Sequence, residues 1–206
     1  MARVVKQADE RRQELLDTAM RLFVERGFNA VSMRDIASAA QVTPGLAYHY
    51  FDSKQTLFGQ VLESYARQCA AAGVRILDDP SSTFPQKIDA LLETISHEEH
   101  LPYHEFFHKE GNRAFHDQLS VSLCDLLVPH LAAAIRTEGR RRGARIESPE
   151  TLADFIAHGL INLLSDPDTP DPDALTHVRS YIEALMASQL AAASGSASHE
   201  HAVVHP

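Results

Sequence analysis

The stretch SMRDIASAAQVTPGLAYHYF, residues 32–51, decides the fold of the N-terminal part of this chain. Ser32 is followed three residues later by Asp35, which is the spacing of a capping box at the start of a helix. Thr43-Pro44 has the pattern of an N-cap residue followed by proline at the first helical position. The stretch therefore predicts two short helices joined by a tight turn.

These two short helices follow a longer one. Apolar residues recur at helical spacing between Asp9 and Arg26, and Gly27 supplies the stop. Three helices in this order form a helix-turn-helix unit, whose last short helix is narrow enough to enter a major groove. Gly45 in that helix would allow close approach of the backbone to DNA. A structural helical hairpin without DNA is the alternative interpretation.

Charge is distributed unevenly along the 206 residues. The net charge is −9, but residues 1–54 carry eight Lys/Arg and seven Asp/Glu, whereas the rest carries eleven and twenty-one. A nucleic-acid partner needs only a local cluster of cations, so any DNA contact is expected at the N-terminal end.

The rest of the chain also has helical periodicity, without a convincing strand pattern. We expect an all-α fold of about nine helices, with a helix-turn-helix head on a helical body. Beyond the head, breaks at Pro80, Pro102, Pro149 and 166–173 separate these helices. Pro129 should kink a long helix over about 113–142. The polar segment 193–206 is expected to be disordered.

The head resembles the DNA-binding domain of the TetR family of bacterial regulators. The resemblance covers about residues 9–69, in order and with the right spacings. The matching residues are Leu22-Phe23, Gly27-Phe28, Ile36-Ala37, Val42-Thr43-Pro44-Gly45, Tyr48-His49-Tyr50-Phe51 and Lys54-Gln55-Thr56-Leu57. It implies a DNA-binding domain over 9–69 and an effector-binding and dimerisation domain over 70–192. It also implies that the chain is a transcriptional regulator rather than an enzyme, and a repressor because most members of the family are repressors.

The resemblance also implies which residues touch DNA. Contacts to bases or sugars are expected from Thr43, Pro44, Gly45, Tyr48 and His49. Phosphate contacts are expected from Ser32, Arg34, Tyr50 and Lys54. An exposed cation beside the recognition helix would in any case add salt-dependent affinity, which supports Lys54 independently.

Two features depart from the family pattern. Gln41 stands where the turn often has glycine, and a left-handed conformation there costs on the order of 1 kcal/mol, so the turn should survive. Leu46 and Ala47 are apolar, and no Arg, Asn or Gln lies between residues 43 and 49. Bidentate base readout is therefore sparse.

The resemblance further implies that the body contacts a second copy of the chain and binds a small organic effector. Apolar stripes over about 149–165 and 172–192 can form a four-helix bundle with a partner, or face the chain's own core. A dimer is also needed because one short recognition helix covers few base pairs. Candidate effector-binding residues in the middle helices are Tyr65, Leu91, Phe106, Phe107, Leu123, Leu127 and Phe155.

Histidines cluster between His97 and His116, and His104-Glu105-x-x-His108 matches the zinc-protease pattern. One alternative is therefore a regulator that senses a metal ion through His104 and His108, with His100, Glu105, His116 or Cys124 assisting. A remoter one is a zinc hydrolase with Glu105 as general base, although the missing strands oppose it. Histidines facing solvent or an organic ligand are the plainer interpretation.

Composition limits the remaining function classes. Cys69 and Cys124 are the two cysteines and lie far apart in sequence, so no disulfide framework is expected. No apolar run has the about 20 residues needed to cross a bilayer, and the N-terminus lacks the pattern of a secretory signal. We therefore expect a cytoplasmic protein without a cofactor or a membrane partner. Arg140-Arg141-Arg142 is interpreted as a solvated helix end.

Overall fold

The computed structural model describes residues 2–95, 103–164 and 172–200, with side chains placed for 8–95, 103–163 and 173–191. These residues form nine helices and contain no strand. The helices are α1 (Ala2–Arg26), α2 (Met33–Ala39), α3 (Pro44–Tyr50), α4 (Lys54–Asp78), α5 (Phe84–Ile95), α6 (His104–His108), α7 (Arg113–Arg141), α8 (Pro149–Leu164) and α9 (Pro172–Glu200). The predicted all-helical architecture is confirmed.

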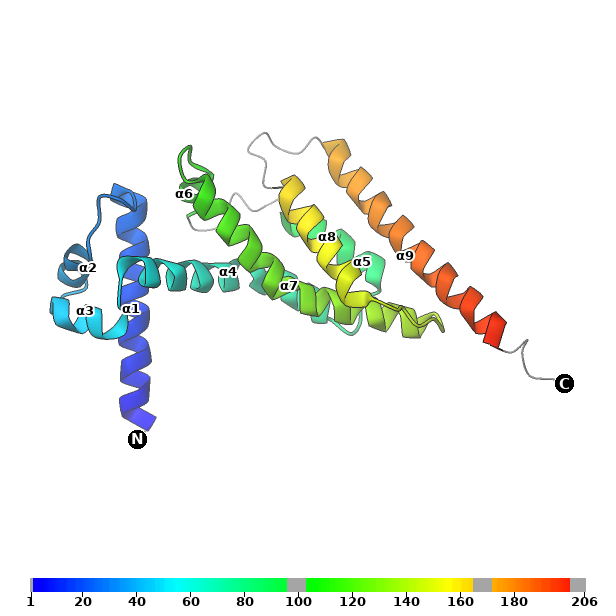
Figure 1. Ribbon diagram of the computed structural model, residues 1–206, viewed down its shortest axis with the longest axis horizontal. Helices are drawn as coiled ribbons and strands as arrows, with labels where there is room; N and C mark the ends of the chain where they lie inside the picture. Colours follow the sequence, from blue (N-terminus) through cyan, green and yellow to red (C-terminus); the bar gives the residue numbers. More distant parts are fainter. Residues whose placement is uncertain (1, 96–102, 165–171, 201–206) are drawn as a thin grey trace.

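The head consists of α1, α2, α3 and the first half of α4, gathered at one end of the molecule (Figure 1). Its core is apolar, and Phe23, Ile36, Ala47 and Leu57 are almost completely buried there. Gly27 ends α1 with a positive φ of 83°, and its N–H donates to the carbonyl of Phe23 at 2.8 Å. The glycine stop predicted from the sequence is thus confirmed.

Helix α4 leads from the head into the body, as Figure 1 shows. The predicted domain boundary between residues 69 and 70 falls inside this continuous helix. Helices α7 and α8 pack together in the body, and α4 packs along α7. A second core, which includes Leu131, Ile135 and Ile156, lies between these helices. The head and the body are therefore joined by one rigid element.

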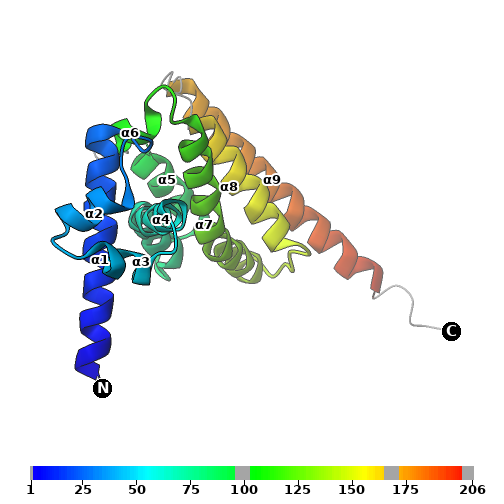
Figure 2. The same ribbon diagram turned by 60° about the vertical axis from the view of Figure 1, so that its left-hand side comes forward.

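Helix α7 carries Pro129 in its interior and changes direction part-way along its length in both views (Figures 1 and 2). Proline removes one backbone hydrogen bond and clashes with the preceding turn, which accounts for such a bend. Contrary to the sequence analysis, α7 is long and apolar enough by length and composition to cross a bilayer, with a mean hydropathy of 1.5 over its most apolar 18 residues. It is the one such helix among the described residues, and core helices of soluble proteins share these properties.

Two helices extend beyond their predicted ends. Helix α1 begins at Ala2 rather than near Asp9. Helix α9 continues to Glu200, past the predicted boundary at residue 192, so part of the segment expected to be disordered has helical backbone. Its alanines and unbranched residues have high helix propensity, which outweighs the small polar residues near its end.

Candidate nucleic-acid interface

Helix α3 presents the face that the sequence predicts for DNA contact. Thr43, Pro44, Gly45, Tyr48 and His49 are all exposed. Tyr48 is the most informative, because half of the surface of this large aromatic residue (50%) faces solvent. The opposite face of α3 is fixed to the head through the fully buried Ala47. The outward face is thus presented on a rigid support.

Local hydrogen bonds begin α3 where the sequence predicts. The hydroxyl of Thr43 accepts from the backbone N–H of Leu46 at 3.3 Å, and Pro44 occupies the first helical position. A Cβ placed on Gly45 would meet nothing within 4 Å. The chain's own packing therefore leaves room for a side chain here, and the open surface remains accessible to an approaching partner.

The turn between α2 and α3 is left-handed at Gln41, as expected. Its φ is 56°, and its N–H donates to the carbonyl of Ser38 at 3.1 Å. The next N–H, of Val42, donates to the carbonyl of Ala37 at 2.9 Å. These bonds hold a conformation that glycine adopts more cheaply, so the turn forms without glycine.

The start of α2 is a complete capping box. The N–H of Asp35 donates to the hydroxyl of Ser32 at 3.2 Å, and the N–H of Ser32 donates to the carboxylate of Asp35 at 2.7 Å. Hydrogen bonds from Ser32 lower the pKa of Asp35. Ser32 is thus part of the helix cap, while Arg34 beside it is exposed.

Lys54 has a role that the sequence does not reveal. Its Nζ donates to the carbonyls of Phe28 and Val31, at 2.9 Å each, and lies 4.3 Å from the centre of the Phe28 ring. The side chain therefore fastens the loop that joins α1 to α2. One of its three N–H bonds is left over for another acceptor, such as a phosphate.

Several predicted DNA-contact residues share one surface depression. Ser32, Tyr48 and Lys54 line it together with the ends of the loops before α2 and α4, and its volume is about 460 Å³. Tyr50 is half-buried, and its ring lies 5.6 Å from that of His49. The depression thus brings together Ser32, Tyr48 and Lys54, whereas the other predicted residues do not line it.

The candidate effector residues do not form a single cavity. Tyr65, Phe106 and Phe107 are core residues beneath the head, with Leu123 packed against them. Leu91 and Leu127 belong to the second core. Phe155 is 68% exposed on α8 and faces away from both cores.

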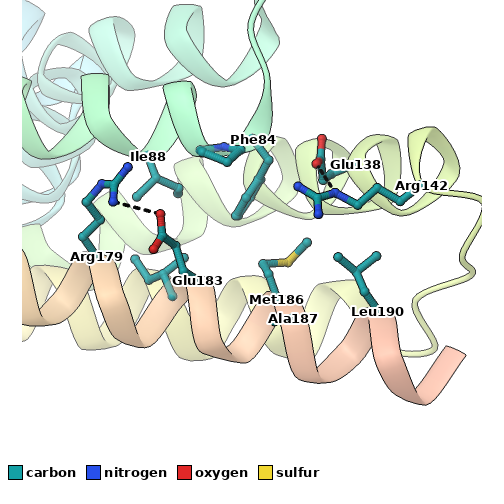
Figure 3. A pocket seen from close by; sticks show the side chains of 11 residues that line it. Phe84, Ile88, Glu138, Arg142, Arg179, Glu183, Met186, Ala187 and Leu190 are labelled. Carbon is teal, nitrogen blue, oxygen red and sulfur yellow. Dashed lines mark hydrogen bonds and ion pairs between the residues drawn. The ribbon is translucent and has the colours of Figure 1, made fainter. Parts of the chain in front are cut away.

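A groove between α5, the end of α7 and α9 has a volume of about 220 Å³, and none of the predicted effector residues lines it. Phe84, Ile88 and Met186 supply apolar walls, and Arg142 and Arg179 supply charge (Figure 3). Sequence reasoning missed these residues because α5 and α9 are far apart in the chain. The arginine run was the available signal, and it was interpreted as a helix end.

The described histidines approach one another near α6. The rings of His104 and His108 are stacked, with their centres 4.0 Å apart, and the ring centre of His116 lies 4.8 Å from that of His108. Burial, then the neighbouring His104 and His116, lowers the pKa of His108 to about 4. His97 and His100 lie outside the described residues, and Glu105 is exposed.

No group of three or more His, Cys, Asp or Glu side chains within the described ranges is arranged to hold a metal ion. Cys124 is buried, and burial raises the pKa of its thiol to about 11, which disfavours the thiolate that metals bind. The metal-sensing hypothesis therefore gains no support from this part of the chain.

Comparison with known proteins agrees with this geometry. Residues 15–61 match the family described as bacterial regulatory proteins, tetR family. The repressor KstR2 of Rhodococcus jostii is 49% identical over 55 residues, which are 27% of each chain. KstR2 of Mycobacterium tuberculosis is 35% identical over 100 residues, 47% of this chain and 50% of that protein. The chain thus matches half or less of the length of these relatives.

The fold extends the likeness beyond the head. The structure of GusR from Salmonella enterica covers 86% of this chain and 95% of that one, with a TM-score of 0.58 at 20% identity. At this identity the likeness shows a fold shared over the head and the body. Residues 15–61 therefore resemble the helix-turn-helix domain of the tetR-family regulators, and this match gives the zinc-hydrolase alternative no support.

Proposed function

We propose that this chain is a homodimeric repressor that binds palindromic operator DNA through α3 and is released by a small organic effector. The exposed face of α3, with Tyr48 and His49 directed outward from a buried support, is the observation that carries the proposal. The division into a head over about 9–69 and a body over about 70–192 is part of it. Repression follows the printed names of the KstR2 relatives, and the cytoplasm is the proposed location.

Exposed apolar residues on α8 and α9 support the dimer. Phe155, Leu163 and Tyr181 are 68%, 53% and 64% exposed. The inward positions of the same helices, such as Ile156 and Ile182, are already buried in the chain's own core. Exposed large apolar side chains of this kind mark interfaces. We assign these parts of α8 and α9 to contact with the corresponding helices of a second copy, which would place two heads on one operator.

Aromatic rings connect the body with the head and supply a route for release. The ring centre of Phe115, at the start of α7, lies 4.5 Å from that of Phe58 in α4 and 5.3 Å from that of Phe28 in the α1–α2 loop. A shift of α7 would therefore move the loop that Lys54 fastens. An effector that binds better to the shifted arrangement would favour the state that misfits the operator.

Binding to DNA from the gene's own upstream region, measured over a series of salt concentrations, tests the proposal. We expect nanomolar affinity and a steep loss of affinity with salt. Arg34→Ala, in the head, should reduce the salt slope by about one, because one phosphate contact is lost. Arg145→Ala removes the same charge from the body and should leave the slope unchanged. Equal slopes for all three proteins would contradict the proposal.

A further inference from the structure

The groove between α5 and α9 has an apolar floor, with the Glu138–Arg142 ion pair at one end and the Arg179–Glu183 ion pair at the other (Figure 3). Phe84 and Ile88 of α5 face Met186 of α9 across it (Figure 3), and Ile182 also lines it. The guanidinium of Arg142 extends from the end of α7 toward Met186 and Leu190, below Glu138. The groove therefore suits a molecule that is apolar along its length and polar at one end.

At the end of the groove formed by α7, Arg142 is paired with a buried carboxylate. The side chain of Glu138 is 7% exposed, and it accepts a hydrogen bond of 2.7 Å from Nε of Arg142. That bond uses one edge of the guanidinium. Within the described parts of the chain no partner is present for the two terminal nitrogens of Arg142, whose side chain is 56% exposed at the mouth. These two nitrogens can donate a pair of hydrogen bonds to a carboxylate.

The other charges of the groove are already neutralised. Arg179 donates through Nε to Asp89 at 2.5 Å and pairs through another nitrogen with Glu183 at 2.9 Å. The hydrogen bond from Arg179 lowers the pKa of Asp89 and keeps it ionised. Glu138, in contrast, is shared between Arg142 and Arg141, whose Nη1 lies 4.0 Å from it, so two guanidiniums stand against one carboxylate at this end and Arg142 can accept an incoming anion.

We propose that this groove binds a small amphipathic carboxylate, with its apolar group between Phe84 and Met186 and its carboxylate on Arg142. Octanoate, an unbranched alkyl chain with a terminal carboxylate, has this combination of groups and serves as the probe.

If the chain is a regulator as proposed, a ligand bound between α5 and α9 is a candidate effector. That role rests on the proposed function, whereas binding of the carboxylate in the groove does not. The groove is lined by residues of α5, the end of α7 and α9, and no residue of the head lines it. Helix α5 follows α4 directly in the chain, so a ligand that separates α5 from α9 would act on the helix that leads into the head.

Calorimetric titration of the full chain without DNA tests the site with octanoate, octan-1-ol and octylammonium. We expect octanoate to bind with a dissociation constant on the order of 0.1–1 mM, and octylammonium at least about tenfold more weakly. Arg142→Gln should weaken octanoate about tenfold and leave octanol unchanged. Arg145→Gln is the matched control and should bind octanoate like the parent.

A second variant keeps the test independent of the Glu138–Arg142 pair. Ala187 lines the groove but is exposed, so Ala187→Trp should fill the space without disturbing the core, and octanoate binding should fall at least about tenfold. Octanoate that binds the parent no better than octylammonium, or that binds Ala187→Trp with parental affinity, would overturn the proposal. Because no DNA is present, these results are separate from failure of operator binding.

Discussion

Single residues of the head show where sequence reasoning succeeds. The capping residues Ser32 and Thr43 and the stop at Gly27 lie where the sequence predicts, because each depends on bonds to near neighbours in the chain. Lys54 is different, because the carbonyls it binds are 23 and 26 residues away. A lysine beside a predicted recognition helix could only be interpreted as a phosphate ligand until the fold brought those carbonyls near.

Lys54→Met should lower the free energy of unfolding by about 1–3 kcal/mol, because two partly buried carbonyls lose their donor. Denaturation in urea measures this loss. Gln55→Met, at the exposed neighbouring position, should change stability little. An unchanged stability of Lys54→Met combined with a smaller salt slope of DNA binding would mean that Lys54 serves the phosphate alone.

Gln41→Gly should raise the free energy of unfolding by about 0.5–1 kcal/mol, since Gln41 adopts a positive φ of 56° that costs less for glycine. The greater freedom of glycine in the unfolded chain limits the gain. Ala39→Gly, at the helical end of α2, should instead lose a similar amount. If urea denaturation shows both variants destabilised, the left-handed turn is not as described.

At the scale of helices, the periodicity of apolar residues predicts the number and order of the helices. It does not predict which helix packs against which. The stripes on α8 and α9 could not be divided into residues buried within the chain and residues left for a partner. The structure divides them: Ile156 is buried, whereas the adjacent Phe155 is exposed. The groove between α5 and α9 was likewise beyond prediction, since it depends on contact between distant segments.

The junction of α6 and α7 should make stability depend on pH through His108. In the unfolded chain His108 takes up a proton near its ordinary pKa of 6.5, whereas in the folded chain it stays neutral down to about 4. Protonation therefore favours the unfolded state, so the stabilisation is complete above 6.5 and is lost as the pH falls from there toward 4.

Urea denaturation at about pH 7 and about pH 5 measures this dependence. His108→Gln should lose less stability between the two values than the parent, although His104 and His116 remain nearby. His158→Gln, an exposed histidine on α8, should lose as much as the parent. The same loss in all three proteins would rule out His108 as the source.

At the scale of the whole molecule, a head of nearly balanced charge sits on an acidic body, and an exposed apolar face lies on α8 and α9. Phe155→Asp with Tyr181→Asp should convert a dimer of twice 22.8 kDa to a monomer, because two carboxylates cannot be buried unpaired. Sedimentation equilibrium measures the mass. Val121→Asp alters another exposed apolar residue (53%), on α7, and should leave the dimer intact. A monomeric parent would contradict the assignment.

The central claim is that the outer face of α3 reads DNA, and affinity for the upstream operator tests it most directly. Tyr48→Ala with His49→Ala should weaken binding on the order of 10- to 100-fold at constant salt, since outward contacts are lost while Ala47 keeps the helix in place. Gln118→Ala with Val121→Ala, exposed on α7, should bind like the parent. Parental affinity in the Tyr48/His49 variant would contradict the account.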